Sequence, residues 1–165
     1  MSAQASKNET KVTTPTDTTI RIEREFDAPR ELVWECFSDA DLLAQWIGPR
    51  KYEIRVEKFD FREGGEWKYI HSDDENEYVF FGEFRKIDEP EHVTQTFNFV
   101  MEPQIPGSID ASDFIDLGGD RCRVVTISTF ESQDFRDGMI QSGMEGGLSE
   151  SYERLDELAA RKLAG

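Results

Sequence analysis

The feature that most constrains the fold is a change of hydrophobic period near residue 130. Up to that point most segments alternate apolar and polar side chains, the pattern of strands with one face in water. From residue 135 onward, apolar residues recur at steps of about three to five, as on one face of a helix: Phe135, Ile140, Met144, Leu148, Tyr152, Leu155, Ala159 and Leu163. Consecutive strands followed by a long helix exclude a doubly wound parallel sheet and predict an α+β fold.

The strand-like part is divided by short turns such as Gly64–Gly65, which favour antiparallel pairing. Its segments are 19–26, 52–59, 66–71, 77–87, 92–100, 109–117 and 121–130. Two short helices are predicted between the first and second segments, because apolar residues recur at helical spacing up to Gly48 and Pro49. We therefore expect a curved antiparallel sheet of about six to seven strands wrapped around the long C-terminal helix, the only element long enough to cover its apolar face.

Four glycines interrupt the first half of that helix, and each costs about 1 kcal/mol relative to alanine. They are Gly138, Gly143, Gly146 and Gly147. One explanation is close packing on neighbouring backbone or fraying of the helix start. The other is a thin helical wall that leaves space between helix and sheet. The sequence leaves both explanations open.

The charge of the chain lies in its foldable part. Residues 1–18 are polar, their lysines balance their acidic residues, and they contain no apolar run. We expect a disordered tail over 1–18 and a single domain over 19–165. The formal net charge of -16, from 35 acidic and 19 basic residues, then belongs to the domain. Nucleic acid and anionic membranes are therefore not expected as partners.

Sequence motifs for metal, cofactor or covalent chemistry are missing. Cys36 and Cys122 have no metal or redox spacing, so we expect two buried thiols. His71 and His92 belong to no zinc motif, and there is no phosphate loop or nucleophile elbow. We expect no metal, no cofactor and no assigned catalytic residue. No apolar run resembles a signal peptide or a membrane span, which predicts a cytoplasmic location.

The residues expected to line a cavity are mostly aromatic and lie on the predicted strands and the long helix. They are Trp46, Trp67, Tyr69, His71, Phe81, Glu83, Gln95, Phe97, Phe99, Met144, Leu148 and Tyr152. Glu83 shares strand phase with Phe81, and Gln95 shares it with Phe97, so each could place a polar group among apolar ones. Ligand sites are built in this way. Alternatively, a bulge breaks the phase, or these residues lie at the rim.

His71 has two interpretations. It shares strand phase with Trp67 and Tyr69, which would make it a single polar group in an aromatic pocket. Alternatively it faces solvent beside the acidic turn at 73–75, where the carboxylates would raise its pKa.

Four segments in order resemble the SRPBCC (START-like, helix-grip) superfamily, and within it the branch named for activators of the heat-shock-protein-90 ATPase. They are FDAPRELVWECFSDADLLAQWIGP at 26–49, GGEWKY at 64–69, FGEFRKIDEPEHVTQTF at 81–97 and GMIQSGMEGGLSESYERLDELAA at 138–160. The resemblance covers about residues 18–163. It implies a helix-grip fold with a cavity between the long helix and the sheet, often used for lipids or other apolar small molecules. Leu148 stands where many members have tryptophan, which implies a wider cavity here.

The function expected from these features is binding of a small apolar or amphipathic molecule by a monomer or weak dimer. One alternative is a chaperone-linked or regulatory interaction module whose acidic surface meets a partner with a basic surface. Another, less favoured, is a cyclase or hydrolase-like enzyme using Glu83, His71 or Tyr69. The enzyme alternative requires a buried titratable group with a perturbed pKa in the cavity.

Overall fold

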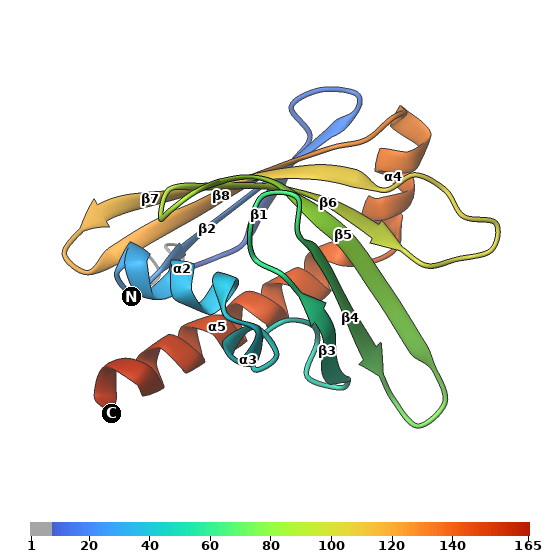
Figure 1. Cartoon of the computed structure of the whole chain (residues 1–165). Helices are drawn as coiled ribbons and strands as arrows, with labels where there is room; N and C mark the ends of the chain where they lie inside the picture. Colours follow the sequence, from blue (N-terminus) through green and yellow to red (C-terminus); the bar gives the residue numbers. More distant parts are fainter. Residues whose placement is uncertain (1–7) are drawn as a thin grey trace.

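The computed structural model describes residues 8–165, and one continuous sheet and four helices account for most of them (Figure 1). The strands are β1 (Lys11–Thr13), β2 (Thr19–Phe26), β3 (Glu53–Phe59), β4 (Glu66–Ser72), β5 (Glu77–Asp88), β6 (His92–Phe99), β7 (Ser108–Gly118) and β8 (Arg121–Thr129). The helices are α2 (Arg30–Ser38), α3 (Ala40–Leu43), α4 (Gln133–Gln141) and α5 (Met144–Ala164).

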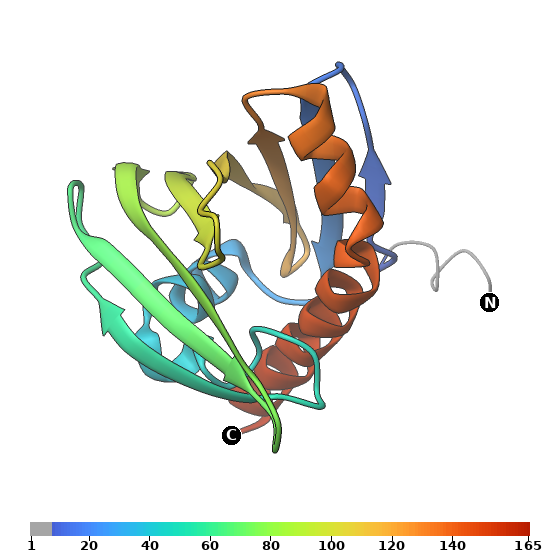
Figure 2. The same ribbon diagram turned by 90° about the vertical axis from the view of Figure 1, so that its right-hand side faces the viewer.

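The eight strands form one sheet in the order β1-β2-β8-β7-β6-β5-β4-β3. Every neighbouring pair is antiparallel, as the short turns predict. The sheet curves around the long C-terminal helix, and the short helices α2 and α3 lie against the same side (Figures 1 and 2). The predicted α+β helix-grip architecture is confirmed.

The first strand corrects the expectation for residues 1–18. Residues 11–13 do not form a disordered tail but pair with β2, with Val12 opposite Ile22. Val12 is half-buried against the core. The edge of β2 offers unpaired backbone groups, and pairing with them can order a short segment that has little apolar surface of its own. Residues 1–7 lie outside the described residues.

The C-terminal helix is also interrupted, which the sequence pattern did not predict. Gly143 adopts a left-handed conformation with φ of 85°, and this separates α4 from α5. Ser142 closes α4 by donating from its hydroxyl to the Met139 carbonyl at 2.6 Å. A single helix from residue 135 is therefore wrong, because the apolar stripe continues across a turn that only the backbone geometry reveals.

The second half of α5 packs tightly on the sheet. Leu155 and Ala159 are buried, and Tyr152 meets the ring of Phe26 edge-on with centroids 5.3 Å apart. Cys36 and Cys122 are fully buried free thiols, as predicted, and burial raises their pKa to about 11 and about 12. Among residues 8–165, no helix is both long enough and apolar enough to cross a membrane.

Candidate ligand-binding cavity

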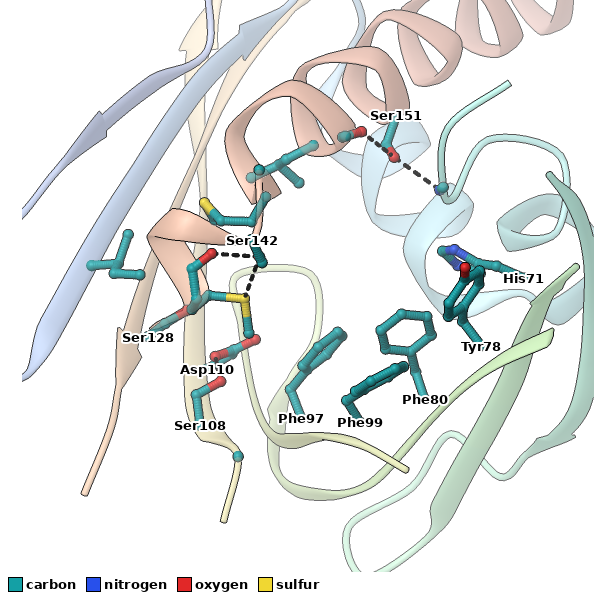
Figure 3. Close-up of a pocket in the computed structure, with 18 of the residues that line it drawn as sticks. His71, Tyr78, Phe80, Phe97, Phe99, Ser108, Asp110, Ser128, Ser142 and Ser151 are labelled. Carbon is teal, nitrogen blue, oxygen red and sulfur yellow. Dashed lines mark hydrogen bonds between the residues drawn. The ribbon is translucent and has the colours of Figure 1, made fainter. Parts of the chain in front are cut away.

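A cavity of about 1230 Å³ lies between the sheet and the first half of the helical layer (Figure 3). Small-molecule pockets typically occupy about 300–1,000 Å³, so this space exceeds what a compact ligand needs. Strands β4 to β8, the first half of β2, and helices α4 and α5 contribute to its wall. We call it the helix–sheet cavity.

One side of the helix–sheet cavity is an aromatic wall built by three adjacent strands. It consists of Tyr69, His71, Tyr78, Phe80, Phe97 and Phe99. Phe80 lies at its centre, with its ring centroid 5.5 Å from that of Phe97 and 5.2 Å from that of Phe99. Rings at these separations attract one another, so the wall is held in place without a ligand.

The opposite side is the glycine-interrupted helix. A Cβ atom placed on Gly138, Gly143 or Gly146 would have no atom within 4 Å, leaving aside the adjacent residues and the backbone of the same helix turn. On Gly147 it would meet only the Pro49 side chain at 3.5 Å. All four glycines line the cavity. Close packing on neighbouring backbone therefore does not explain them. Gly143 is required by its left-handed backbone, and for Gly138, Gly146 and Gly147 the thin-wall explanation fits.

A polar patch interrupts the apolar lining on β7 and β8, and we call Ser108, Asp110 and Ser128 the Asp110 patch (Figure 3). The Ser108 hydroxyl donates to Asp110 Oδ1 at 2.7 Å, and Ser128 is the partner of Asp110 across the ladder. Burial raises the pKa of Asp110, while hydrogen bonds from both serines oppose the rise. The sequence interpretation did not include this patch, although Asp110 shares strand phase with Phe114, which is buried.

Of the two interpretations of His71, the structure supports the one that places it in an aromatic pocket and not the one that places it in solvent. It is buried, stacks on Tyr69 at 5.4 Å and lies 4.7 Å from Phe80, centroid to centroid. Its Nε2 is buried without a hydrogen-bond partner. Burial, and secondarily the charge of Arg154, lowers its pKa to about 4. The increase expected from the acidic turn is therefore wrong.

Stability should depend on pH through His71. Its pKa falls from the ordinary 6.5 to about 4 on folding, so between these values the unfolded chain binds a proton that the folded chain does not. The contribution to stability is complete above pH 6.5 and is lost as the pH falls toward 4, at no more than about 1.4 kcal/mol per unit. Urea unfolding at several pH values should show a shallower loss for His71→Phe than for the wild type. An equal loss of stability with falling pH in both proteins would contradict this prediction. The carboxylates that also titrate in this range are the same in both proteins, so their contribution cancels when the two are compared.

Half of the residues predicted for the cavity line it. These are Tyr69, His71, Phe97, Phe99, Met144 and Leu148. Trp46 and Tyr152 are buried instead in the core beneath the packed half of α5. Trp67 is also buried, with its ring stacked 5.0 Å from that of Tyr69, and does not reach the cavity.

Phe81, Glu83 and Gln95 do not line the cavity either. Phe81 pairs in register with Lys68, whose ammonium meets Glu57 in solvent, so Phe81 and Glu83 belong to the outer face of β5. The run of apolar residues around Phe80 hid the phase of this strand. Gln95 shares the inner face with Phe97 and is aligned with Phe84 on one side and Asp110 on the other, but it does not itself line the cavity.

A curved antiparallel sheet gripping a C-terminal helix, with a cavity between them, defines a START-like protein of the SRPBCC superfamily. Residues 27–160 match the family described as Activator of Hsp90 ATPase homolog 1-like protein. The chain belongs to this family, as its four sequence segments suggested.

Solved structures share the fold over nearly the whole chain. A solution NMR structure of a protein from Arthrobacter aurescens is 27% identical, with a TM-score of 0.82 over 92% of this chain and 91% of the other. The crystal structure of protein Ms6760 from Mycobacterium smegmatis is 26% identical, with a TM-score of 0.80 over 90% and 94%. A crystal structure from Rhodobacter sphaeroides, 18% identical with a TM-score of 0.83 over 93% and 99%, shares the fold alone. No protein of curated function matches the chain significantly.

Proposed function

We propose that the protein binds a small apolar or amphipathic molecule in the helix–sheet cavity. The observation that carries the proposal is the pairing of an aromatic wall with a helix whose cavity side bears glycines instead of side chains. Gly138, Gly146 and Gly147 lie inside α4 and α5 and lower helix stability, and no close packing on neighbouring backbone makes up for the loss. A sequence that keeps the space open at this cost is consistent with a site that is filled by a ligand.

An enzyme is a second candidate function, favoured by one observation. The cavity contains two groups with displaced pKa values, Asp110 and His71, as a catalytic site requires. Neither Glu83 nor Tyr69 supports it as predicted: Glu83 is on the outer face beside Arg85, and burial raises the pKa of Tyr69 further from neutrality. The interaction-module alternative rests on the net charge alone and stays a prediction.

Filling the cavity from the helix side should weaken binding. Replacing Gly146 with leucine places a side chain in the open space at this position, and we expect roughly tenfold weaker binding of the neutral dye Nile red, a loss of about 1.4 kcal/mol. Fluorescence titration of the purified chain measures the affinity.

Glu145→Leu is the matched control, because Glu145 is exposed on the same helix and does not line the cavity. Its affinity for Nile red should equal that of the wild type. Absence of Nile red binding to the wild type, or an equal loss of affinity in Gly146→Leu and Glu145→Leu, would refute binding in this cavity.

A further inference from the structure

Asp110 has a carboxylate without a cationic partner. Among residues 8–165 no lysine, arginine or histidine nitrogen lies within 4.0 Å of it, and its hydrogen-bonding neighbours are the neutral hydroxyls of Ser108 and Ser128. Both serines are buried. Asp110 itself is half-buried, and an ionised carboxylate that is partly removed from water and met only by neutral donors is incompletely compensated.

The cations that line the cavity are held elsewhere. Arg50 pairs with Glu157 at 2.6 Å, and Lys51 Nζ lies 5.1 Å above the ring of Tyr52. Both belong to the loop before β3, and the charge of Lys51 acts on Tyr78. Figure 3 shows Tyr78 and His71 on the side of the cavity away from Asp110. Neither Arg50 nor Lys51 therefore neutralises Asp110, which is free to pair with a positive group supplied by a ligand.

The Asp110 patch also adjoins the apolar surface directly. Ser108 is the register partner of Phe97 across β6 and β7, and Phe97 and Phe99 extend the wall toward Phe80 (Figure 3). A molecule with a polar end at Asp110 can thus lay its apolar body on these rings without crossing a second polar region.

We propose that the Asp110 patch is a subsite for the protonated amine of an amphipathic ligand whose apolar body lies along Phe97, Phe99 and Phe80. This rests on the proposed binding function and adds the chemical class of the ligand. A charge-assisted bond between ammonium and carboxylate is stronger than a neutral hydroxyl contact, so an amine is preferred over an alcohol of equal length. The net charge of -16 attracts a cation further.

The test compares displacement of Nile red by 1-aminodecane and by 1-decanol, both below their aggregation limits. In the wild type the amine should displace the dye at a concentration at least roughly tenfold lower than the alcohol. In Asp110→Asn, which keeps the size and a hydrogen-bonding group, this advantage should disappear while displacement by 1-decanol is unchanged. Asp113→Asn removes the same charge from an exposed position on β7 and should keep the advantage.

Equal displacement by amine and alcohol in the wild type would overturn the proposal, and this comparison needs no variant to fold. Loss of the advantage in Asp113→Asn as well as in Asp110→Asn would also overturn it, since the preference would then come from overall charge. In both cases Nile red still binds, so the proposed function stands. Failure of Nile red to bind the wild type would remove the proposed function and this subsite together.

Discussion

Replacing Asp156 with alanine should lower the free energy of unfolding by about 3–5 kcal/mol, because it leaves a buried charge without a partner. Arg24 follows Ile20 and Ile22 on the inner face of β2, and its side chain is only 3% exposed. Its guanidinium pairs with the Asp156 carboxylate on α5 and lies 4.8 Å from the centre of the Phe26 ring. The pair thus joins the packed half of the helix to the sheet.

Two matched variants separate burial from charge. Glu157→Ala breaks an ion pair one residue further along α5, but both partners there are about half exposed, so the loss should stay below about 1 kcal/mol. The double variant Arg24→Met with Asp156→Leu should recover most of the stability lost in Asp156→Ala, since apolar replacements of both partners leave no buried charge. Urea denaturation measures all of them. Equal losses for Asp156→Ala and Glu157→Ala would contradict the role assigned to burial.

Most of the fold could be predicted from the sequence, because its strands alternate cleanly between short turns. The exceptions are local. Lys11–Thr13 has too little apolar surface to indicate a strand and is ordered by pairing with β2. The break at Gly143 is hidden because apolar residues on both sides face the same cavity. Hydrophobic period reports the direction in which side chains point and cannot report a turn that preserves it.

The site was less predictable, for reasons that differ between strands. On β4 and β6 the phase of Tyr69 and Phe97 is unambiguous, and these residues line the cavity. On β5 consecutive aromatic residues leave the phase open, and Phe80 faces inward in place of Phe81. Asp110 was missed because one carboxylate among 35 acidic residues does not stand out by its residue type. Phase with a neighbouring buried phenylalanine was the available clue.

The structure divides the helical layer into two parts with different tasks. Between Gly138 and Gly147 the cavity side of the helical layer bears four glycines beside Met139 and Met144, so the space above the aromatic wall is only partly filled, and the cavity lies there. From Tyr152 onward the inner side chains are large or closely packed and buried. Stability and ligand binding should therefore respond to different substitutions. Residues of the same apolar stripe should affect ligand binding when they lie before Tyr152 and stability when they lie from Tyr152 onward.

Trp46 and Phe80 provide the sharpest test of that division. Trp46 is 1% exposed, its Nε1 donates to the Cys36 carbonyl at 2.9 Å, and its ring packs on Phe37 and Tyr152. Trp46→Ala should cost about 3–5 kcal/mol of unfolding free energy. Because folded domains have about 5–15 kcal/mol in all, Trp46→Phe is the safer variant. It should still lower stability, because the smaller ring leaves part of the core space empty and the Cys36 carbonyl loses its hydrogen bond. Nile red affinity should stay unchanged.

Phe80→Ala should do the reverse. Phe80 is half-buried at the centre of the aromatic wall, so its loss removes contact surface for the ligand and opens little new space in the packed core. We expect a drop in Nile red affinity of roughly tenfold or more, with a smaller loss of stability than in Trp46→Ala. Chemical denaturation and dye titration on the same preparations give both quantities. If Trp46→Phe lowered Nile red affinity as much as Phe80→Ala did, the tryptophan would belong to the cavity after all, and the division between packed and open halves would be wrong.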